Sequence, residues 1–175
     1  HKPSTPIKES LLIELKQSLQ TSPLVEKIKK ARNVIIVCDD YTRPTPTDII
    51  LPPLIEYLEK IGIKLNKIKI LIAAGFHRRM TKTEKVKKYG KDIVDNFEII
   101  HHDALNYSQL VFLGKSSKGI PIWINQLVLN ADFVIGIGIV EIHPWAGFAG
   151  GTKIISPGVA GKKTIDATHA IPVLY

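Results

Sequence analysis

The 175-residue chain lacks several features that would place it in a common protein class. Its single cysteine, Cys38, excludes a disulfide within the chain and fits a reducing compartment such as the cytoplasm. No stretch approaches the roughly 18 consecutive apolar residues of a membrane-spanning helix, so we expect no membrane association. Neither a GxGxxG fingerprint nor a P-loop is present, since the pair Gly136 and Gly138 lies inside an apolar run.

Positive charge is in excess, with 24 Lys and Arg residues against 16 Asp and Glu residues and a net charge of +8. Much of this excess lies in the helical stretches 26–32 and 82–91, where solvated helix faces explain it. No zinc finger or aromatic RNA-binding strand accompanies it, so we expect no nucleic-acid partner. The charge still favours a small anionic substrate or cofactor.

Apolar runs alternate with stretches of helical spacing along most of the chain. Continuous apolar runs are typical of strands buried on both faces of a parallel sheet, and their alternation with helices predicts an α/β fold with a mostly parallel sheet. A length of 175 residues suffices for one ordinary core. The predicted strands are 33–38, 69–74, 97–101 and 131–140, with a hairpin over 111–124. The predicted helices are 7–19, 23–32, 47–61, a helix from Thr81 or Thr83 to 94, and 158–170. Pro52 and Pro53 are expected to bend or delay the third of these helices.

Three polar clusters follow predicted strands: residues 39–43, 75–80 and 141–153. Ligands of open α/β sheets bind at the carboxyl ends of the strands, so we expect the three clusters to form one site. In the first cluster, Pro44 biases Arg43 away from helix, and Arg43 could bind a carboxylate or phosphate through two hydrogen bonds. Asp40 could hold that guanidinium or accept from a sugar hydroxyl. A capped loop with a surface ion pair remains the alternative.

Two histidines and one lysine in these clusters are candidates for chemistry. His77 leaves a buried strand beside Gly75, and its near-neutral pKa suits proton transfer, although a structural histidine remains open. Arg78 and Arg79 would lower that pKa if they lie close. Lys153 follows the glycines of 147–151 and could be a phosphate partner or an amine nucleophile.

His169 lies in a predicted helix with no metal-ligating partner three or four residues away. Metal sites made by proteins normally need three or four ligands, so spacing alone argues against one here. His169 could bind a metal only if a cofactor supplied the other ligands.

Taken together, three stretches resemble the nickel-dependent lactate racemase family, the nickel-pincer-nucleotide racemases and epimerases of 2-hydroxy acids. The stretches are DDYTRPTP (39–46), GFHRRMT (75–81) and HPWAGFAGGTKIISPGVA (143–160), together with His169. The resemblance implies a Rossmann-like three-layer α/β domain. Residues 1–175 would be a single N-terminal cofactor-binding domain, a fragment whose C-terminal domain is absent, and we expect the fragment alone to be inactive.

The resemblance also assigns roles by position. His77 and His143 would be the catalytic acid–base pair, Lys153 the covalent attachment of the cofactor through a thioamide, and His169 the nickel ligand. The loop Asp40, Tyr41, Thr42 and Arg43 would bind the cofactor, with Arg43 also near the substrate. The cofactor would be Ni(II)-pyridinium-3,5-bisthiocarboxylate mononucleotide, whose two sulfurs and one carbon complete a square-planar site with the histidine. We expect it to be absent from the fragment, because separate biosynthesis enzymes make it.

In the mechanism that the resemblance implies, one histidine takes the 2-hydroxyl proton while the Cα hydride moves to the cofactor, which leaves a planar keto acid. The hydride then returns to the opposite face of the keto acid, and the other histidine is the acid–base partner in that step. The substrate would be a small 2-hydroxy acid such as lactate. Arg79 stands where the family pattern often has proline, and it could alter the pKa of His77 or the substrate preference. Two alternatives remain: an NAD-type dehydrogenase domain, disfavoured by the missing fingerprint, and a non-catalytic nucleotide- or anion-binding module, which needs no histidine pair.

Overall fold

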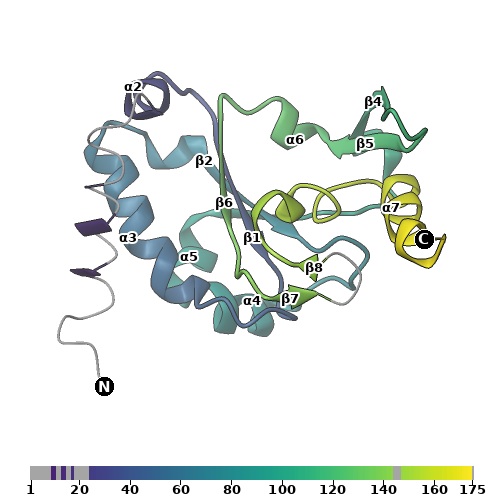
Figure 1. The fold of residues 1–175 in the computed structure, drawn as a ribbon. Coiled ribbons are helices and arrows are strands. Elements are labelled where there is room, and N and C mark those ends of the chain that lie inside the picture. The colour runs from purple at the N-terminus through teal and green to yellow at the C-terminus, as the bar shows by residue number, and fades with distance from the viewer. Residues whose placement is uncertain (1–8, 11–12, 15–16, 18–23, 144–146, 175) are drawn as a thin grey trace.

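A four-stranded parallel sheet forms the centre of the computed structural model, which describes residues 9–10, 13–14, 17, 24–143 and 147–174. Its strands lie in the order β3 (Glu98–His101), β2 (Ile68–Ala73), β1 (Val34–Asp39) and β6 (Phe133–Ile137) (Figure 1). In the central strand β1, Val34 lies opposite both Ile68 and Phe133, and all six residues are buried. The apolar runs in the sequence therefore predicted this sheet correctly.

Helices cover one face of the sheet. They are α2 (Leu24–Lys29), α3 (Thr47–Lys60), α4 (Lys82–Tyr89) and α5 (Lys91–Asn96). Alternate residues of β1, namely Val34, Ile36 and Cys38, belong to the same buried cluster as Leu51 and Leu58 of α3. This is the largest core of the described residues, and it fixes the first helical layer.

The opposite face is covered by shorter segments. Ile35 and Val37 of β1 cluster with Val159 and with the half-buried Ile154 and Leu127. These partners come from the 3₁₀ helix η3 (Gly151–Ile154), the chain after it, and α6 (Gln126–Leu129). The sheet is thus sandwiched between two layers, which confirms the Rossmann-like three-layer α/β fold.

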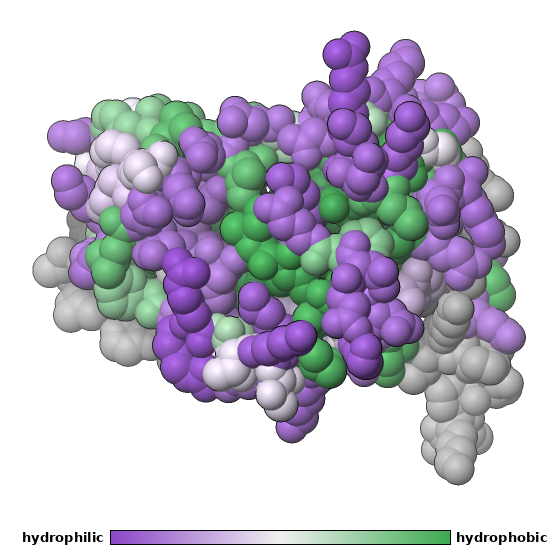
Figure 2. Space-filling model, turned by 180° about the vertical axis from the view of Figure 1, so that it is seen from behind, coloured by the Kyte–Doolittle hydropathy of each residue, from purple (hydrophilic) through white to green (hydrophobic). Residues whose placement is uncertain are grey.

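Smaller elements surround this core (Figure 1). The predicted hairpin is present as antiparallel β4 and β5, and a short antiparallel ribbon of β7 and β8 follows β6. Their bounds, with those of the remaining elements, are β4 (Leu110–Lys115), β5 (Pro121–Asn125), β7 (Ile142–His143), β8 (Gly147–Phe148), η1 (Leu65–Lys67), η2 (Tyr107–Gln109) and α7 (Lys162–Leu174). Hydrophilic side chains cover much of the rear face, with hydrophobic surface exposed between them (Figure 2).

The structure corrects several predicted boundaries. Helix α3 begins at Thr47 and continues through both prolines, so the predicted delay is wrong. The helix predicted to reach residue 94 is divided in two at Gly90, whose φ of 89° breaks it. Its first half begins after Thr81, which forms a capping box with Glu84.

Two further elements near the site differ from prediction. Strand β6 ends at Ile137 rather than at residue 140, and a Cβ on Gly136 would lie 3.1 Å from the Ile154 side chain, so η3 packs closely over the strand. Helix α7 begins at Lys162 rather than at 158 because the preceding residues turn tightly after η3. Most of the predicted 7–19 helix and residues 144–146 lie outside the described residues. No described helix is long and apolar enough to cross a membrane.

Candidate active site

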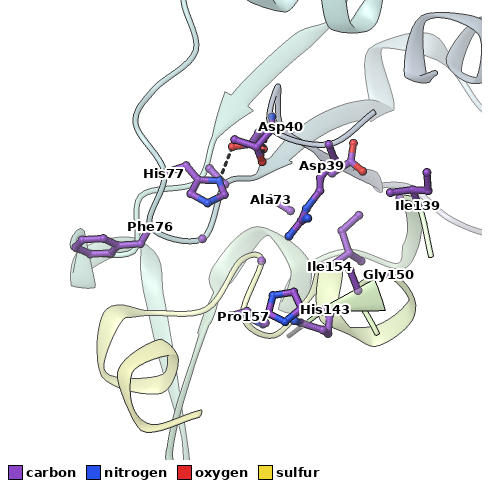
Figure 3. Close-up of a pocket in the computed structure, with 18 of the residues that line it drawn as sticks. Asp39, Asp40, Ala73, Phe76, His77, Ile139, His143, Gly150, Ile154 and Pro157 are labelled. Atoms are coloured by element: carbon purple, nitrogen blue, oxygen red, sulfur yellow. Dashed lines mark hydrogen bonds and ion pairs between the residues drawn. The ribbon is translucent and has the colours of Figure 1, made fainter. Parts of the chain in front are cut away.

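A cavity of about 230 Å³ opens at the carboxyl ends of β1, β2 and β6 (Figure 3). The chain runs from β1 to β2 on one side, whereas β6 flanks β1 on the other, so the cavity lies where the strand order reverses. All three predicted clusters contribute to it. Its polar lining comprises Asp39, Asp40, Thr42, Arg43, His77, His143, Lys153 and His169.

Seven of the eight residues predicted for the site therefore meet in this cavity, and Tyr41 does not line it. The Tyr41 ring is 38% exposed, and the Arg78 guanidinium lies 4.4 Å from its centroid in a cation–π contact. The roles assigned to the seven residues stay predictions. What the structure establishes is their convergence.

His77 is held by the buried carboxylate of Asp40. Its Nδ1 lies 2.7 Å from Asp40 Oδ2, while Asp40 Oδ1 accepts from the Thr42 amide at 3.0 Å and from the Thr42 hydroxyl at 2.5 Å. The hydrogen bond to Asp40 raises the pKa of His77 above its ordinary value, against a lowering by burial. Burial alone would raise the pKa of Asp40, but the bonds from His77 and Thr42 outweigh it and lower that pKa.

The neighbouring arginines, which would lower the pKa of His77 if they lay close to it, are not among the causes of its shift. Arg78 forms an exposed two-bond ion pair with Glu84, and Arg79 lies 3.4 Å from Asp103. The cation that opposes protonation of His77 is instead Arg43. Arg79 lines a second cavity, which shares His77 with the candidate site.

Arg43 lines the cavity and forms an ion pair with Glu141, and both side chains are about one-third exposed. Sequence analysis did not identify Glu141 as the partner, since 98 residues separate the pair along the chain. An arginine guanidinium has five N–H donors, so one bond to Glu141 leaves others for a ligand carboxylate or phosphate.

His143 and Lys153 form the other half of the polar lining. Burial lowers the pKa of His143, and the positive charges of Lys153, Arg43 and His169 add to this effect. Burial and the Arg43 charge also lower the pKa of Lys153. A lower pKa increases the fraction of the amine that is unprotonated and can act as a nucleophile. The pKa values of His77 and His143 are therefore shifted in opposite directions.

Glycines let the backbone close tightly around this half of the cavity. Gly150 has a φ of 82°, and a Cβ there would lie 2.6 Å from the Ile139 carbonyl oxygen. A Cβ on Gly158 would lie 2.2 Å from the Ile154 carbonyl oxygen. Any side chain would push the cavity wall outward, so these positions require glycine.

His169 projects into the cavity from α7. Its Nδ1 lies 2.7 Å from the Ile165 carbonyl oxygen, which can only accept, so Nδ1 carries the proton and Nε2 keeps its lone pair. That tautomer leaves Nε2 available as a metal ligand, with the other ring nitrogen held by a backbone carbonyl. The described residues contain no group of three His, Cys, Asp or Glu side chains that could hold a metal ion. A metal ion bound by His169 would therefore need most of its ligands from another source.

The fold and the cavity define a Rossmann-like domain with a histidine–lysine site at the strand-order switch. The chain belongs to the family of lactate racemase N-terminal domains, whose model matches residues 2–174. A lactate racemase of Lactiplantibacillus plantarum is 39% identical over 162 residues, and that of Thermoanaerobacterium thermosaccharolyticum is 37% identical over 155 residues. The matches cover 93% and 89% of the chain but only 38% and 36% of these relatives.

Solved structures agree with this assignment. The lactate racemase apoprotein of T. thermosaccharolyticum matches with a TM-score of 0.81 and 36% identity, over 90% of the chain and 38% of that structure. A crystal structure of a Thermotoga maritima protein matches with a TM-score of 0.80 and 28% identity, over 99% of the chain and 43% of that structure. The chain thus spans well under half the length of each relative.

Proposed function

We propose that this chain is the cofactor-holding part of a racemase or epimerase of small 2-hydroxy acids such as lactate. One observation carries the proposal: His77, after β2, and His143, on β7, line one cavity together with Arg43 and Lys153. Inversion at a carbon through a planar intermediate needs an acid–base group for each face, and a carboxylic acid needs a cation to bind it. The family relationship supports the same reaction class.

Lys153 and His169 are the residues that would hold a nickel pincer nucleotide. The lowered pKa of Lys153 suits covalent attachment, and the free lone pair expected on His169 Nε2 suits nickel. The loop from Asp40 to Arg43 borders the same cavity and would contact the rest of the cofactor. When bound, this cofactor would accept the Cα hydride of the substrate and return it.

The two histidines would move the hydroxyl proton. Asp40 keeps the proton of His77 on Nδ1, so that Nε2 can accept from the 2-hydroxyl group of one enantiomer. His143 has a lowered pKa and would serve the other enantiomer. Oppositely shifted histidines are a suitable pair because one can donate while the other accepts. Proton transfer of this kind contributes roughly 10²–10⁴-fold to rate.

Arg43 would bind the substrate carboxylate. Its guanidinium stands at the cavity, with Glu141 fixing one of its nitrogens. A planar guanidinium fits a carboxylate through two parallel hydrogen bonds, which orients the adjacent Cα. A carboxylate held there would bring the 2-hydroxyl group into the cavity that the two histidines line.

The remaining part of the protein would close the site. A cavity of about 230 Å³ is small beside the roughly 300–1,000 Å³ of complete ligand pockets. The ribbon that carries His143 also exposes apolar side chains beside the cavity, with Ile142 83% exposed and Phe148 64% exposed. Both features support a second domain that covers the mouth and adds substrate contacts, as the greater length of the relatives allows.

The test uses the full-length protein, co-produced with the enzymes that make the cofactor. We expect stoichiometric nickel, an added mass on the peptide containing Lys153, and interconversion of the enantiomers of at least one acid in a panel of 2-hydroxy acids. Lys153→Met should lose both nickel and added mass, whereas Lys163→Met, an exposed lysine on α7, should keep them. A cofactor-supplied protein with neither nickel nor adduct, or one that binds NAD instead, refutes the proposal.

A further inference from the structure

A buried lysine lies beneath the loop that carries Asp40 and Arg43. Lys88 is in the last turn of α4, and its side chain is only 8% exposed, in contrast to the exposed Lys87 beside it. Its Nζ donates to the Arg43 carbonyl oxygen at 2.6 Å and to the Thr45 carbonyl oxygen at 3.0 Å. The Asp39 carboxylate lies 2.9 Å from the same nitrogen.

These contacts combine two hydrogen bonds with an ion pair. A lysine has three N–H donors and no acceptor, and burying its charge is unfavourable unless the charge is paired. Here two donors bind backbone carbonyl oxygens, the Asp39 carboxylate supplies the opposite charge, and all three partners belong to the stretch from Asp39 to Thr45. The adjacent Tyr89 hydroxyl donates to the Asp39 carbonyl oxygen at 2.9 Å. Two neighbouring residues at the end of α4, Lys88 and Tyr89, therefore both bind Asp39 at the end of β1.

The stretch from Asp39 to Thr45, which Lys88 binds, contains two residues of the proposed site. Asp40, the partner of His77, immediately follows Asp39, and the Arg43 carbonyl belongs to the residue whose guanidinium pairs with Glu141. A loop without regular secondary structure has few backbone bonds of its own, and within this one the Arg43 amide makes only a 3.3 Å bond to the Asp40 carbonyl oxygen. The Thr45 hydroxyl donates to the Asp39 carboxylate, and the Thr45 carbonyl oxygen also accepts from the Thr47 amide at 2.8 Å. The ammonium group adds two carbonyl bonds to this small local set, and one of them is to Arg43 itself.

We propose that Lys88 is a positioning residue, which holds the Asp39–Thr45 loop so that Arg43 points into the cavity to bind a carboxylate. The carboxylate part rests on the proposed function, whereas the hold on the loop does not. A purely structural alternative is that Lys88 only neutralises the buried Asp39. The two hypotheses predict different loop mobility when the charges of Lys88 and Asp39 are removed together.

The experiment compares four variants of the full-length protein with the wild type. Lys88→Met alone leaves the buried Asp39 carboxylate with its bond from the Thr45 hydroxyl but without its cation, so it is expected to lower stability. Adding Asp39→Asn removes that unpaired charge, which should restore the thermal midpoint in the double variant. Asp39→Asn alone keeps the two carbonyl bonds to Lys88 and should keep the loop ordered. Lys87→Met is the matched control for loss of a lysine from α4.

The first readout is amide hydrogen exchange of the 39–47 peptide in the cofactor-free protein, which needs no turnover. We expect exchange in the double variant to be at least about tenfold faster than in the wild type, although its stability has recovered. The second readout is turnover of the cofactor-loaded enzyme. We expect KM to rise about tenfold or more, the size of one charge-assisted hydrogen bond, with a smaller change in kcat.

Wild-type exchange in the double variant would overturn the proposal and leave Lys88 a charge partner only. Faster exchange with an unchanged KM would overturn its link to carboxylate binding. A wild-type enzyme that carries the cofactor but turns over no 2-hydroxy acid would refute the proposed function, and the exchange data would still decide whether Lys88 holds the loop.

Discussion

Replacing Asp40 with asparagine would change one oxygen of the His77 partner into an NH₂ group of the same size. In the native protein Asp40 Oδ1 accepts two bonds from Thr42, at 3.0 and 2.5 Å, and Oδ2 lies 2.7 Å from His77 Nδ1. Asparagine has a single carbonyl oxygen, and the Thr42 amide and hydroxyl would both donate to it, so that it takes the position of Asp40 Oδ1. Its NH₂ group would then face His77 Nδ1 and require that nitrogen to accept.

The expected consequence is a change of tautomer. With Nδ1 accepting, the His77 proton moves to Nε2, which can no longer take the hydroxyl proton of the substrate. Losing one acid–base group should lower kcat/KM by roughly 10²–10⁴-fold. Because the two enantiomers have equal free energy, kcat/KM must fall by the same factor from either one, which provides an internal check.

The assay follows enantiomer interconversion by chiral chromatography in the full-length, cofactor-loaded enzyme, with nickel content and thermal midpoint measured on the same samples. Asp95→Asn is the matched control, since it breaks an exposed ion pair with Lys91 on α5 and should leave turnover unchanged. Nitrogen NMR shifts of His77 report its tautomer directly. If the asparagine variant carries nickel, shows the Nε2–H tautomer and still turns over at close to the wild-type rate, the acid–base reasoning is wrong.

Three further predictions concern stability. The pKa of His77 is raised and that of Asp40 is lowered, so their pair should stabilise the fold between the unfolded pKa values of about 3.9 and 6.5. This contribution should be lost as pH rises through the folded pKa of His77, or as pH falls through the folded pKa of Asp40. Urea midpoints measured across this pH range test it. Gly158→Ala should lower the free energy of unfolding by about 1–3 kcal/mol because its Cβ would meet a backbone oxygen at 2.2 Å, whereas Gly138→Ala, with nothing closer than 3.4 Å, should have a smaller effect; equal midpoints in urea would contradict this. Thr81→Ala removes the capping box of α4 and should lower the free energy of unfolding by about 1 kcal/mol, and an unchanged thermal midpoint would show that the cap is not needed.

Sequence patterns were most informative where burial is complete. The run 33–38 predicted β1 because a strand buried on both faces must be apolar throughout. They were least informative where tertiary packing sets a boundary: β6 stops at Ile137 as η3 packs over Gly136, a contact between segments that no local pattern records.

The same division applies to the candidate site. Polar clusters after strands identified six of the seven predicted lining residues, since the carboxyl ends of parallel strands share one edge. The seventh, His169 on α7, came only from the family resemblance. The partners that orient them were missed. Lys88 is one of several lysines in α4, and only its burial distinguishes it from Lys87.

The sequence by itself determined which residue types are available and on which strand ends they stand. It also determined the family, because several spaced motifs occur in the right order. Only the tertiary structure decided how those residues act on each other. The pKa of His77 rises rather than falls because a carboxylate 37 residues away in the chain, and not the adjacent arginines, lies against its ring. Electrostatic effects depend on distance in space, and distance along the chain does not reveal it.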